Sequence, residues 1–145
     1  MKTERMRWWH IEPAIALDAD LFGPEQWSVR MLWSELAQAP TRHYLVAVDG
    51  AELIGYAGLA ALGDEGFIQT IGVRESHQRR GVGAALLEEL LAEADGRSVP
   101  AVLLEVRVDN LVAQRLYKRN GFEPLRIRKG YYQNSGVDAL EMRRG

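Results

Sequence analysis

The segment Gln78-Arg79-Arg80-Gly81-Val82-Gly83 has the residue types and spacing that suit binding of a phosphate group. It lies between an apolar run typical of a strand and the amphipathic run 81–94, which is typical of a helix. The first N–H groups of a helix have no partner within the helix, so they bind anions. Gly81 and Gly83 let the backbone approach a ligand because they lack a Cβ. Two interpretations are open: an anion site, or a tight turn with exposed arginines.

Two common phosphate-binding motifs do not fit this segment. A Walker A loop ends in Gly-Lys-Ser/Thr, and no such ending is present. The dinucleotide-binding fingerprint needs a third glycine, where this chain has Leu86. The segment therefore predicts neither a nucleotide triphosphatase nor a nicotinamide-dependent enzyme.

Glu105 is the second residue that could do chemistry, because it interrupts the apolar run Ala101–Val106. Burying a carboxylate is unfavourable unless it is paired or has a function. Alternation along a strand puts it on the same face as Leu103 and Arg107. Glu105 could pair with a nearby arginine, or it could act as a general base for an amine, directly or through water. An α-amine, with a pKa of about 8, suits a single carboxylate better than a lysine amine near 10.4.

Two polar side chains follow this strand. Asn110 can cap the next helix, because its side-chain oxygen can accept a hydrogen bond from the first turn. Tyr117 lies on that helix, and a phenol with a pKa of about 10 can protonate a departing thiolate whose thiol has a pKa of about 8.5. The other interpretation of Tyr117 is packing against Leu116 and Phe122.

Other catalytic chemistries find little support in the sequence. The chain has no cysteine, which excludes a thiol acyl-enzyme and cysteine-based metal sites. It has no Gly-x-Ser-x-Gly motif of the kind that supports an acyl-serine mechanism. Its three histidines lack metal-ligand spacing, so we expect no metal.

The hydrophobic pattern predicts the elements that position these residues. Apolar runs predict seven strands, at residues 5–11, 43–48, 53–62, 67–73, 101–106, 122–128 and 137–142. Helical periodicity and capping residues predict four helices, at 13–22, 28–38, 81–94 and 110–120. Asp49-Gly50 predicts a hairpin turn, Gly121 a helix end, and 130–136 a second turn. This order favours an α/β (α+β) fold around a central, mostly antiparallel mixed sheet flanked by helices.

Composition is that of an ordinary globular protein, with 145 residues, 47% hydrophobic and 26% charged. No repeat or linker divides the chain, so we expect residues 1–145 to form a single domain. A net charge of -2 gives no reason to expect nucleic acid. No secretory signal is evident, and the apolar run at 84–91 is too short to cross a membrane. We therefore expect a cytoplasmic location.

Several motifs in order carry a resemblance to a known family. Gln-x-x-Gly-x-Gly between a strand and an amphipathic helix resembles the cofactor loop of the GNAT family of N-acetyltransferases. The downstream motifs agree in order and spacing: Leu104-Glu105-Val106-Arg107, Asn110, Leu116-Tyr117 and Asn120-Gly121-Phe122. The tail, with Arg128-Lys129-Gly130-Tyr131-Tyr132 and residues 138–142, is similar to that of the bacterial ribosomal-protein-alanine N-acetyltransferases (RimI-like). The resemblance runs from about residue 45 to 142.

The resemblance implies a GNAT fold in which acetyl-CoA lies between two splayed central strands, 67–73 and 101–106. It implies that Glu105 takes a proton from the acceptor amine and that Tyr117 protonates the coenzyme A thiolate. Trp27 and Tyr131 would line the substrate groove, although both could instead be packing residues. The residues implied to contact the cofactor are Ile71, Gly72, Val73, Gln78, Arg79, Arg80, Gly81, Val82, Gly83, Ala84 and Asn110.

The implied reaction is direct transfer of an acetyl group, in a ternary complex, from acetyl-CoA to the N-terminal α-amine of a protein. For this subgroup the acceptor is the N-terminal alanine of a small-subunit ribosomal protein. Two alternatives are open. The acceptor could be a small-molecule amine or a lysine side chain, or the chain could be a non-catalytic acyl-CoA-binding module.

Overall fold

The computed structural model describes all residues, Met1–Gly145, and its seven strands form one sheet in the order β1-β2-β3-β4-β5-β7-β6. All neighbouring strands are antiparallel except β4 and β5, which are parallel. The predicted GNAT-like, mostly antiparallel mixed sheet is therefore confirmed. The strands are β1 Lys2–Arg5, β2 Arg42–Asp49, β3 Glu52–Leu62, β4 Glu65–Val73, β5 Ala101–Arg107, β6 Glu123–Tyr132 and β7 Val137–Arg144.

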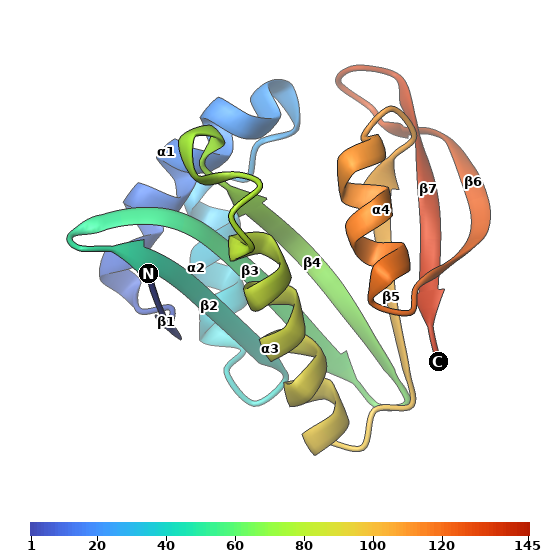
Figure 1. The fold of residues 1–145 in the computed structure, drawn as a ribbon, viewed down its shortest axis with the longest axis horizontal. Coiled ribbons are helices and arrows are strands. Elements are labelled where there is room, and N and C mark those ends of the chain that lie inside the picture. Colours follow the sequence, from blue (N-terminus) through green and yellow to red (C-terminus); the bar gives the residue numbers. More distant parts are fainter.

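Four α-helices cover the two faces of this sheet. They are α1 Ile11–Phe22, α2 Val29–Ala37, α3 Val82–Gly96 and α4 Leu111–Arg119. Helices α3 and α4 lie on one face, and α1 and α2 lie on the other (Figure 1). Each pair covers its own hydrophobic cluster, because both faces of the central strands are apolar. None of the helices combines the length and apolar character that crossing a bilayer would require.

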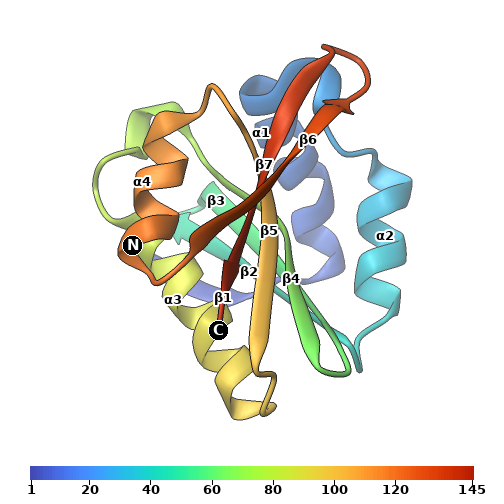
Figure 2. The same ribbon diagram turned by 90° about the vertical axis from the view of Figure 1, so that its right-hand side faces the viewer.

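The two central strands, β4 and β5, separate along their length. They pair only where Glu65, Gly66 and Phe67 lie beside Ala101, Val102 and Leu103. Beyond Phe67, the edge of β4 that faces β5 has no strand partner, while β5 stays paired with β7 on its other side. The expected splay of the central strands is therefore present, and it opens the sheet between α3 and α4 (Figures 1 and 2).

The predicted opening strand, 5–11, is wrong. The strand comes earlier, at Lys2–Arg5, and Trp8–His10 forms a 3-10 turn that leads directly into α1. The ring of His10 accepts a hydrogen bond from the Arg7 N–H at 2.8 Å, which turns the chain out of the sheet. Helix α1 begins at Ile11 rather than Pro13, so the proline is the third residue of the helix. Proline is tolerated there because the backbone amides of the first turn need no intrahelical partner.

Two turns also differ from the prediction. The β2–β3 turn is Gly50-Ala51 rather than Asp49-Gly50, with Gly50 at a φ of 63°. Strand β6 continues to Tyr132, whereas the prediction ended it at 128. Gly130, with a φ of 59°, lies in an irregularity of the β6–β7 ladder rather than in the turn. A glycine with a positive φ is found both in turns and in strand irregularities, so the presence of a glycine in the sequence does not show which of the two it forms.

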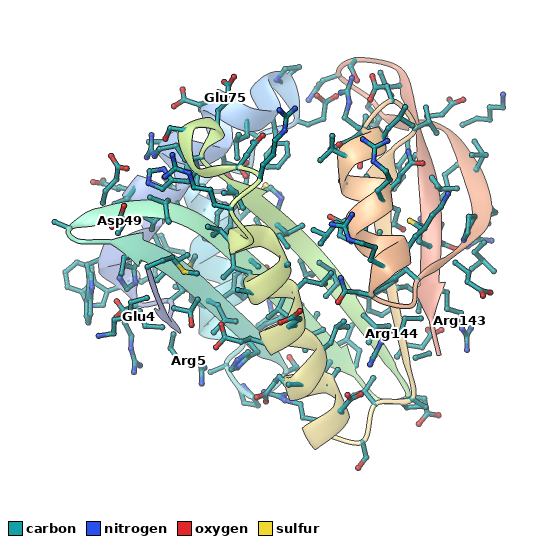
Figure 3. The ribbon with its side chains drawn as sticks, in the orientation of Figure 1. Glu4, Arg5, Asp49, Glu75, Arg143 and Arg144 are labelled. Atoms are coloured by element: carbon teal, nitrogen blue, oxygen red, sulfur yellow. The ribbon has the colours of Figure 1, made fainter.

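The C-terminal strand is tied to the rest of the fold by its charged end. Arg144 pairs with Asp95 of α3 at 3.5 Å, and it lies near the C-terminus beside Arg143 (Figure 3). Gly121, with a φ of 91°, ends α4 as predicted and packs against the Arg144 side chain. The ladder between β5 and β7 holds β7 beside β5 along the whole splayed region.

Candidate active site

The segment from Gln78 to Gly83 forms an exposed turn that ends at the N-terminus of α3. Gly81 is the N-cap residue with a φ of 82°, and no side chain caps this helix. The Ala85 N–H is the first amide to bond within the helix, to the Gly81 carbonyl, so the preceding amides are free for an anion. The guanidinium groups of Arg79 and Arg80 are exposed, and neither forms an ion pair within the protein. This geometry fits a pyrophosphate.

The loop is held against the end of β4. The Gln78 side-chain amide donates to the Val73 carbonyl at 2.9 Å. Glu75, in the 3-10 turn just before the loop, lies at the outer rim of the molecule (Figure 3). Gly72 is buried, and a Cβ there would lie 2.9 Å from Leu21 of α1. Glycine at this position thus lets α1 pack closely on the strand that leads to the loop.

A cavity of about 230 Å³ lies between the splayed strands. Its walls come from β4, β5, α4, the end of β6, and the end of α1 with the segment that follows it. Five of the predicted site residues line it: Trp27, Ile71, Glu105, Asn110 and Tyr117. The open edge of β4 borders this cavity, so its backbone amides and carbonyls are available to the arm of a bound coenzyme.

Glu105 is largely buried in the cavity wall and forms an ion pair. The Arg128 guanidinium donates to its Oε1 at 3.0 Å, which is the arginine pairing left open by the sequence. Burial raises the pKa of Glu105, while Arg128 opposes this rise and Glu141 adds to it. A carboxylate with a raised pKa is a stronger base, so the ion pair and a role as general base are compatible.

Glu141, which the sequence interpretation did not assign to the site, lies directly opposite Glu105 in the β5–β7 ladder. It is buried, and Arg126 pairs with it at 2.9 Å. Arg128 lies 3.9 Å from Glu141 as well, so it faces both carboxylates. Arg126 and Arg128 of β6 therefore pair with the two facing carboxylates. Only strand register could have revealed this contact, because 36 residues separate Glu141 from Glu105 in the sequence.

Tyr117 lies on α4 with its ring packed edge-on against Phe122, 6.0 Å between centroids. The side chain is buried, and its hydroxyl has no hydrogen-bond partner in the protein although it borders the cavity. The hydroxyl is protonated at neutral pH with an ordinary tyrosine pKa of about 10, and burial raises that pKa further, which makes the phenol a weaker acid. Both interpretations of Tyr117 therefore apply to different parts of the side chain: the ring packs and the hydroxyl is free.

Asn110 caps α4, because its side-chain oxygen accepts a hydrogen bond from the Ala113 N–H at 3.1 Å. The same residue lines the cavity, so capping and contact with a ligand do not exclude each other. Its amide nitrogen has no partner within the protein and can donate to a bound molecule.

The outer end of the cavity is closed by segments that are distant in sequence. Trp27 and Tyr132 line it, whereas Tyr131 does not. The ring of Tyr131 is exposed and lies under the Arg128 guanidinium, 4.9 Å from it. The Asn134 side chain donates to the Pro24 carbonyl at 2.6 Å, which joins the β6–β7 turn to the loop before α2 (Figure 2). Sequence alone gives no signal for this contact.

Comparison with known proteins agrees with this geometry. Residues 4–122 match the model of the "Acetyltransferase (GNAT) family". N-alpha-acetyltransferase RimI of Mycobacterium tuberculosis is 44% identical over 133 residues, which cover 88% of this chain and 82% of the relative. The chain belongs to the GNAT acetyltransferase family. It is an N-acetyltransferase.

Two further relatives resemble this acetyltransferase over nearly its whole length. A putative [ribosomal protein bS18]-alanine N-acetyltransferase of Bacillus subtilis is 36% identical over 149 residues, 98% of this chain and 96% of the relative. The crystal structure of the ribosomal-protein-S18-alanine N-acetyltransferase from Escherichia coli superposes with a TM-score of 0.88 at 27% identity. That superposition covers 99% of this chain and 92% of the other. The fold of this acetyltransferase is therefore the GNAT fold.

Proposed function

We propose that this acetyltransferase transfers the acetyl group of acetyl-CoA to the N-terminal α-amine of a protein. The N-terminal alanine of a small-subunit ribosomal protein is the proposed acceptor, and the whole chain acts as one domain. The observation that carries the proposal is the cavity between β4 and β5, where Glu105 and Tyr117 line the same space. The names of the relatives support the acceptor, because two of them are described as ribosomal-protein-alanine N-acetyltransferases.

The donor site is proposed from the free groups of the chain. The loop residues Gln78 to Ala84 would bind the pyrophosphate through backbone amides, with Arg79 and Arg80 adding positive charge. The open edge of β4 at Ile71, Gly72 and Val73 would hydrogen-bond the pantetheine arm. A β4 amide would also stabilise the negative charge that develops on the thioester oxygen. The Asn110 amide would contact the same arm.

The acceptor side would carry out two proton transfers. Glu105 accepts a proton from the amine, directly or through water, which makes the amine nucleophilic for direct attack on the thioester. The Tyr117 hydroxyl donates a proton to the sulfur as the thiolate leaves. Trp27 lines the acceptor end, and Tyr131 is proposed to contact the acceptor further out. The cytoplasmic location and the absence of a metal and a nucleic-acid partner stay predictions.

A peptide panel tests this proposal. The purified chain is incubated with labelled acetyl-CoA and three acceptors: an alanine-starting peptide, the same peptide with a blocked N-terminus and an internal lysine, and a polyamine. We expect label only on the free N-terminus. Label on lysine or polyamine would favour the alternative acceptors, and coenzyme binding without any transfer would favour a binding module.

Two variants serve as matched controls in the panel. Glu105→Gln should lower kcat about a hundredfold or more while leaving coenzyme affinity nearly unchanged, because it removes the base and keeps the shape. Tyr117→Phe should slow transfer to a similar degree, because only the free hydroxyl is lost. Wild-type turnover in Glu105→Gln, or a change below about twofold in Tyr117→Phe, would refute the role of that residue.

A further inference from the structure

Strand β4 contains a bulge at Gln69, two residues beyond its last pair with β5. On the β3 side, Leu59 pairs with Ile68 and Gly58 pairs with Thr70, so Gln69 has no partner in that ladder. On the β5 side, pairing stops at Phe67, two residues earlier. A bulge bends its strand and increases the local twist. The bulge at Gln69 therefore lies at the beginning of the unpaired part of β4.

The side chain of Gln69 is anchored beneath the sheet. Its amide donates a hydrogen bond at 3.1 Å to Oε1 of Glu35, which lies on α2 and is 8% exposed. A hydrogen bond to a buried carboxylate is stronger than one between neutral groups. This bond links the bulge in β4 directly to a helix that lies on the opposite face from α3 and α4 (Figure 2).

The same carboxylate oxygen is held in place by two other donors. The Tyr44 hydroxyl donates to it at 2.7 Å and the Arg42 Nε at 3.0 Å, both from β2. The Tyr44 ring crosses over Gly58, where a Cβ would lie 2.2 Å from the ring. Gly58 is also the β3 residue opposite the bulge. Gly58 thus makes room for the Tyr44 ring beside the bulge, and Arg42 would still hold the Glu35 oxygen if the Tyr44 hydroxyl were removed.

We propose that Gln69, anchored by Glu35, is a positioning residue that fixes the β4 bulge and so sets the open edge on which the acyl donor binds. Gln69 also borders the cavity, with Thr70 and Ile71 following it along the wall. If the anchor is lost, the bulge can shift along β4, and the backbone groups beyond it no longer face the donor in register. The inference rests on the proposed donor site, and it assigns no proton transfer to Gln69.

The test compares Gln69→Leu with Tyr44→Phe by calorimetric titration of coenzyme A and by steady-state kinetics. Each variant removes one donor from the Glu35 carboxylate, but only Gln69→Leu releases the bulge. We expect coenzyme A to bind about tenfold more weakly to Gln69→Leu, with a matching rise in KM for acetyl-CoA. Tyr44→Phe should stay within about twofold of wild type while its melting temperature falls.

A double-mutant cycle extends the test. Glu35→Met, which removes the acceptor oxygen, should weaken coenzyme binding in the wild-type background and add no further loss to Gln69→Leu, because both changes remove the same hydrogen bond. If Gln69→Leu does not fold, Gln69→Met replaces it, since a flexible thioether fills the same space without a donor. The proposal is overturned by equal losses in Gln69→Leu and Tyr44→Phe, by additive losses in the cycle, or by a rise in the acceptor KM alone.

These outcomes are separate from failure of the proposed function. If the wild-type protein binds no coenzyme A, the donor site itself is wrong. If the wild type binds coenzyme A and Gln69→Leu binds it equally well, only the positioning role is wrong.

Discussion

Glu105 lies among charged groups whose effects on its pKa oppose one another. Burial and the facing carboxylate of Glu141 raise that pKa, and the Arg128 guanidinium lowers it. The net direction is upward, which improves Glu105 as a base but leaves it protonated over a wider acidic range. Arg128 therefore limits how far the pKa can rise, in addition to orienting the carboxylate.

Replacing Arg128 should move the pH dependence of catalysis. In Arg128→Met the pKa of Glu105 rises further, because the opposing positive charge is gone. Since transfer needs ionised Glu105, the acid limb of the kcat/KM profile should shift to higher pH. The measurement is kcat/KM for an acceptor peptide across the acidic to neutral range.

Arg126→Met is the matched control for this prediction. Arg126 lies on the same strand, and its ion pair is with Glu141 rather than Glu105. We expect its acid limb not to shift to higher pH. An unchanged profile in Arg128→Met, or equal shifts in both variants, would show that Arg128 does not set the pKa of Glu105.

At the scale of elements, the start of α3 depends on one backbone conformation. Gly81 adopts a φ of 82°, and no atom lies within 4 Å of where its Cβ would be. The requirement for glycine is therefore conformational rather than steric. It lets the chain turn into α3 with the first amides of the helix facing outward.

Gly81→Ala should lower stability by about 1 kcal/mol, because a left-handed conformation is unfavourable for alanine. Relief of that strain would also turn the first amides away, so coenzyme A should bind more weakly. Gly96→Ala, at the last residue of the same helix, is the control and should be neutral or slightly stabilising. Urea denaturation and calorimetric titration measure both effects. Equal changes in stability and in coenzyme A affinity for Gly81→Ala and Gly96→Ala would contradict the prediction that Gly81 is required for its left-handed conformation.

At the scale of the whole molecule, buried carboxylates join the helices to the sheet. Asp18 of α1 is fully buried, and it accepts hydrogen bonds from the Tyr56 hydroxyl at 2.5 Å and the Trp27 N–H at 2.6 Å. Burial raises the pKa of Asp18 despite these two bonds, which lower it. By contrast, the donors around Glu35 outweigh the effect of its burial and lower its pKa.

Asp18 should leave a signature in the pH dependence of global stability. Because its folded pKa is raised, its contribution to stability is complete below the unfolded pKa and is lost as pH rises through the folded value. The stability of the wild type relative to Asp18→Asn should therefore increase as pH falls toward about 4, the ordinary pKa of an aspartate. Urea denaturation at several pH values measures this difference. Asp64→Asn, at an exposed turn position, is the control, and its stability difference from the wild type should not change with pH in this way. If the stability difference between the wild type and Asp18→Asn stayed constant with pH, the prediction would be contradicted.

Much of this architecture could be predicted from local sequence signals. The amphipathic period of α3, the Asn110 cap and the Gly121 helix end each depend on residues close together in the chain. The prediction of the first strand was wrong because of a local interaction that hydrophobic patterns do not report. The strand at 5–11 was lost because a His10 side chain bonds the Arg7 backbone, which no hydrophobic pattern reports.

The sequence by itself determined the order of elements, the phosphate loop and the types of residue available for proton transfer. The tertiary structure decided which of them meet. Pairing of β5 with β7 put Glu141 against Glu105, and the irregularity in β6 put Tyr132 rather than Tyr131 in the cavity wall. A shift of one residue reverses which face a strand side chain occupies, and register is set by contacts far apart in the chain. Local sequence fixes what a residue can do, whereas long-range pairing fixes what it faces.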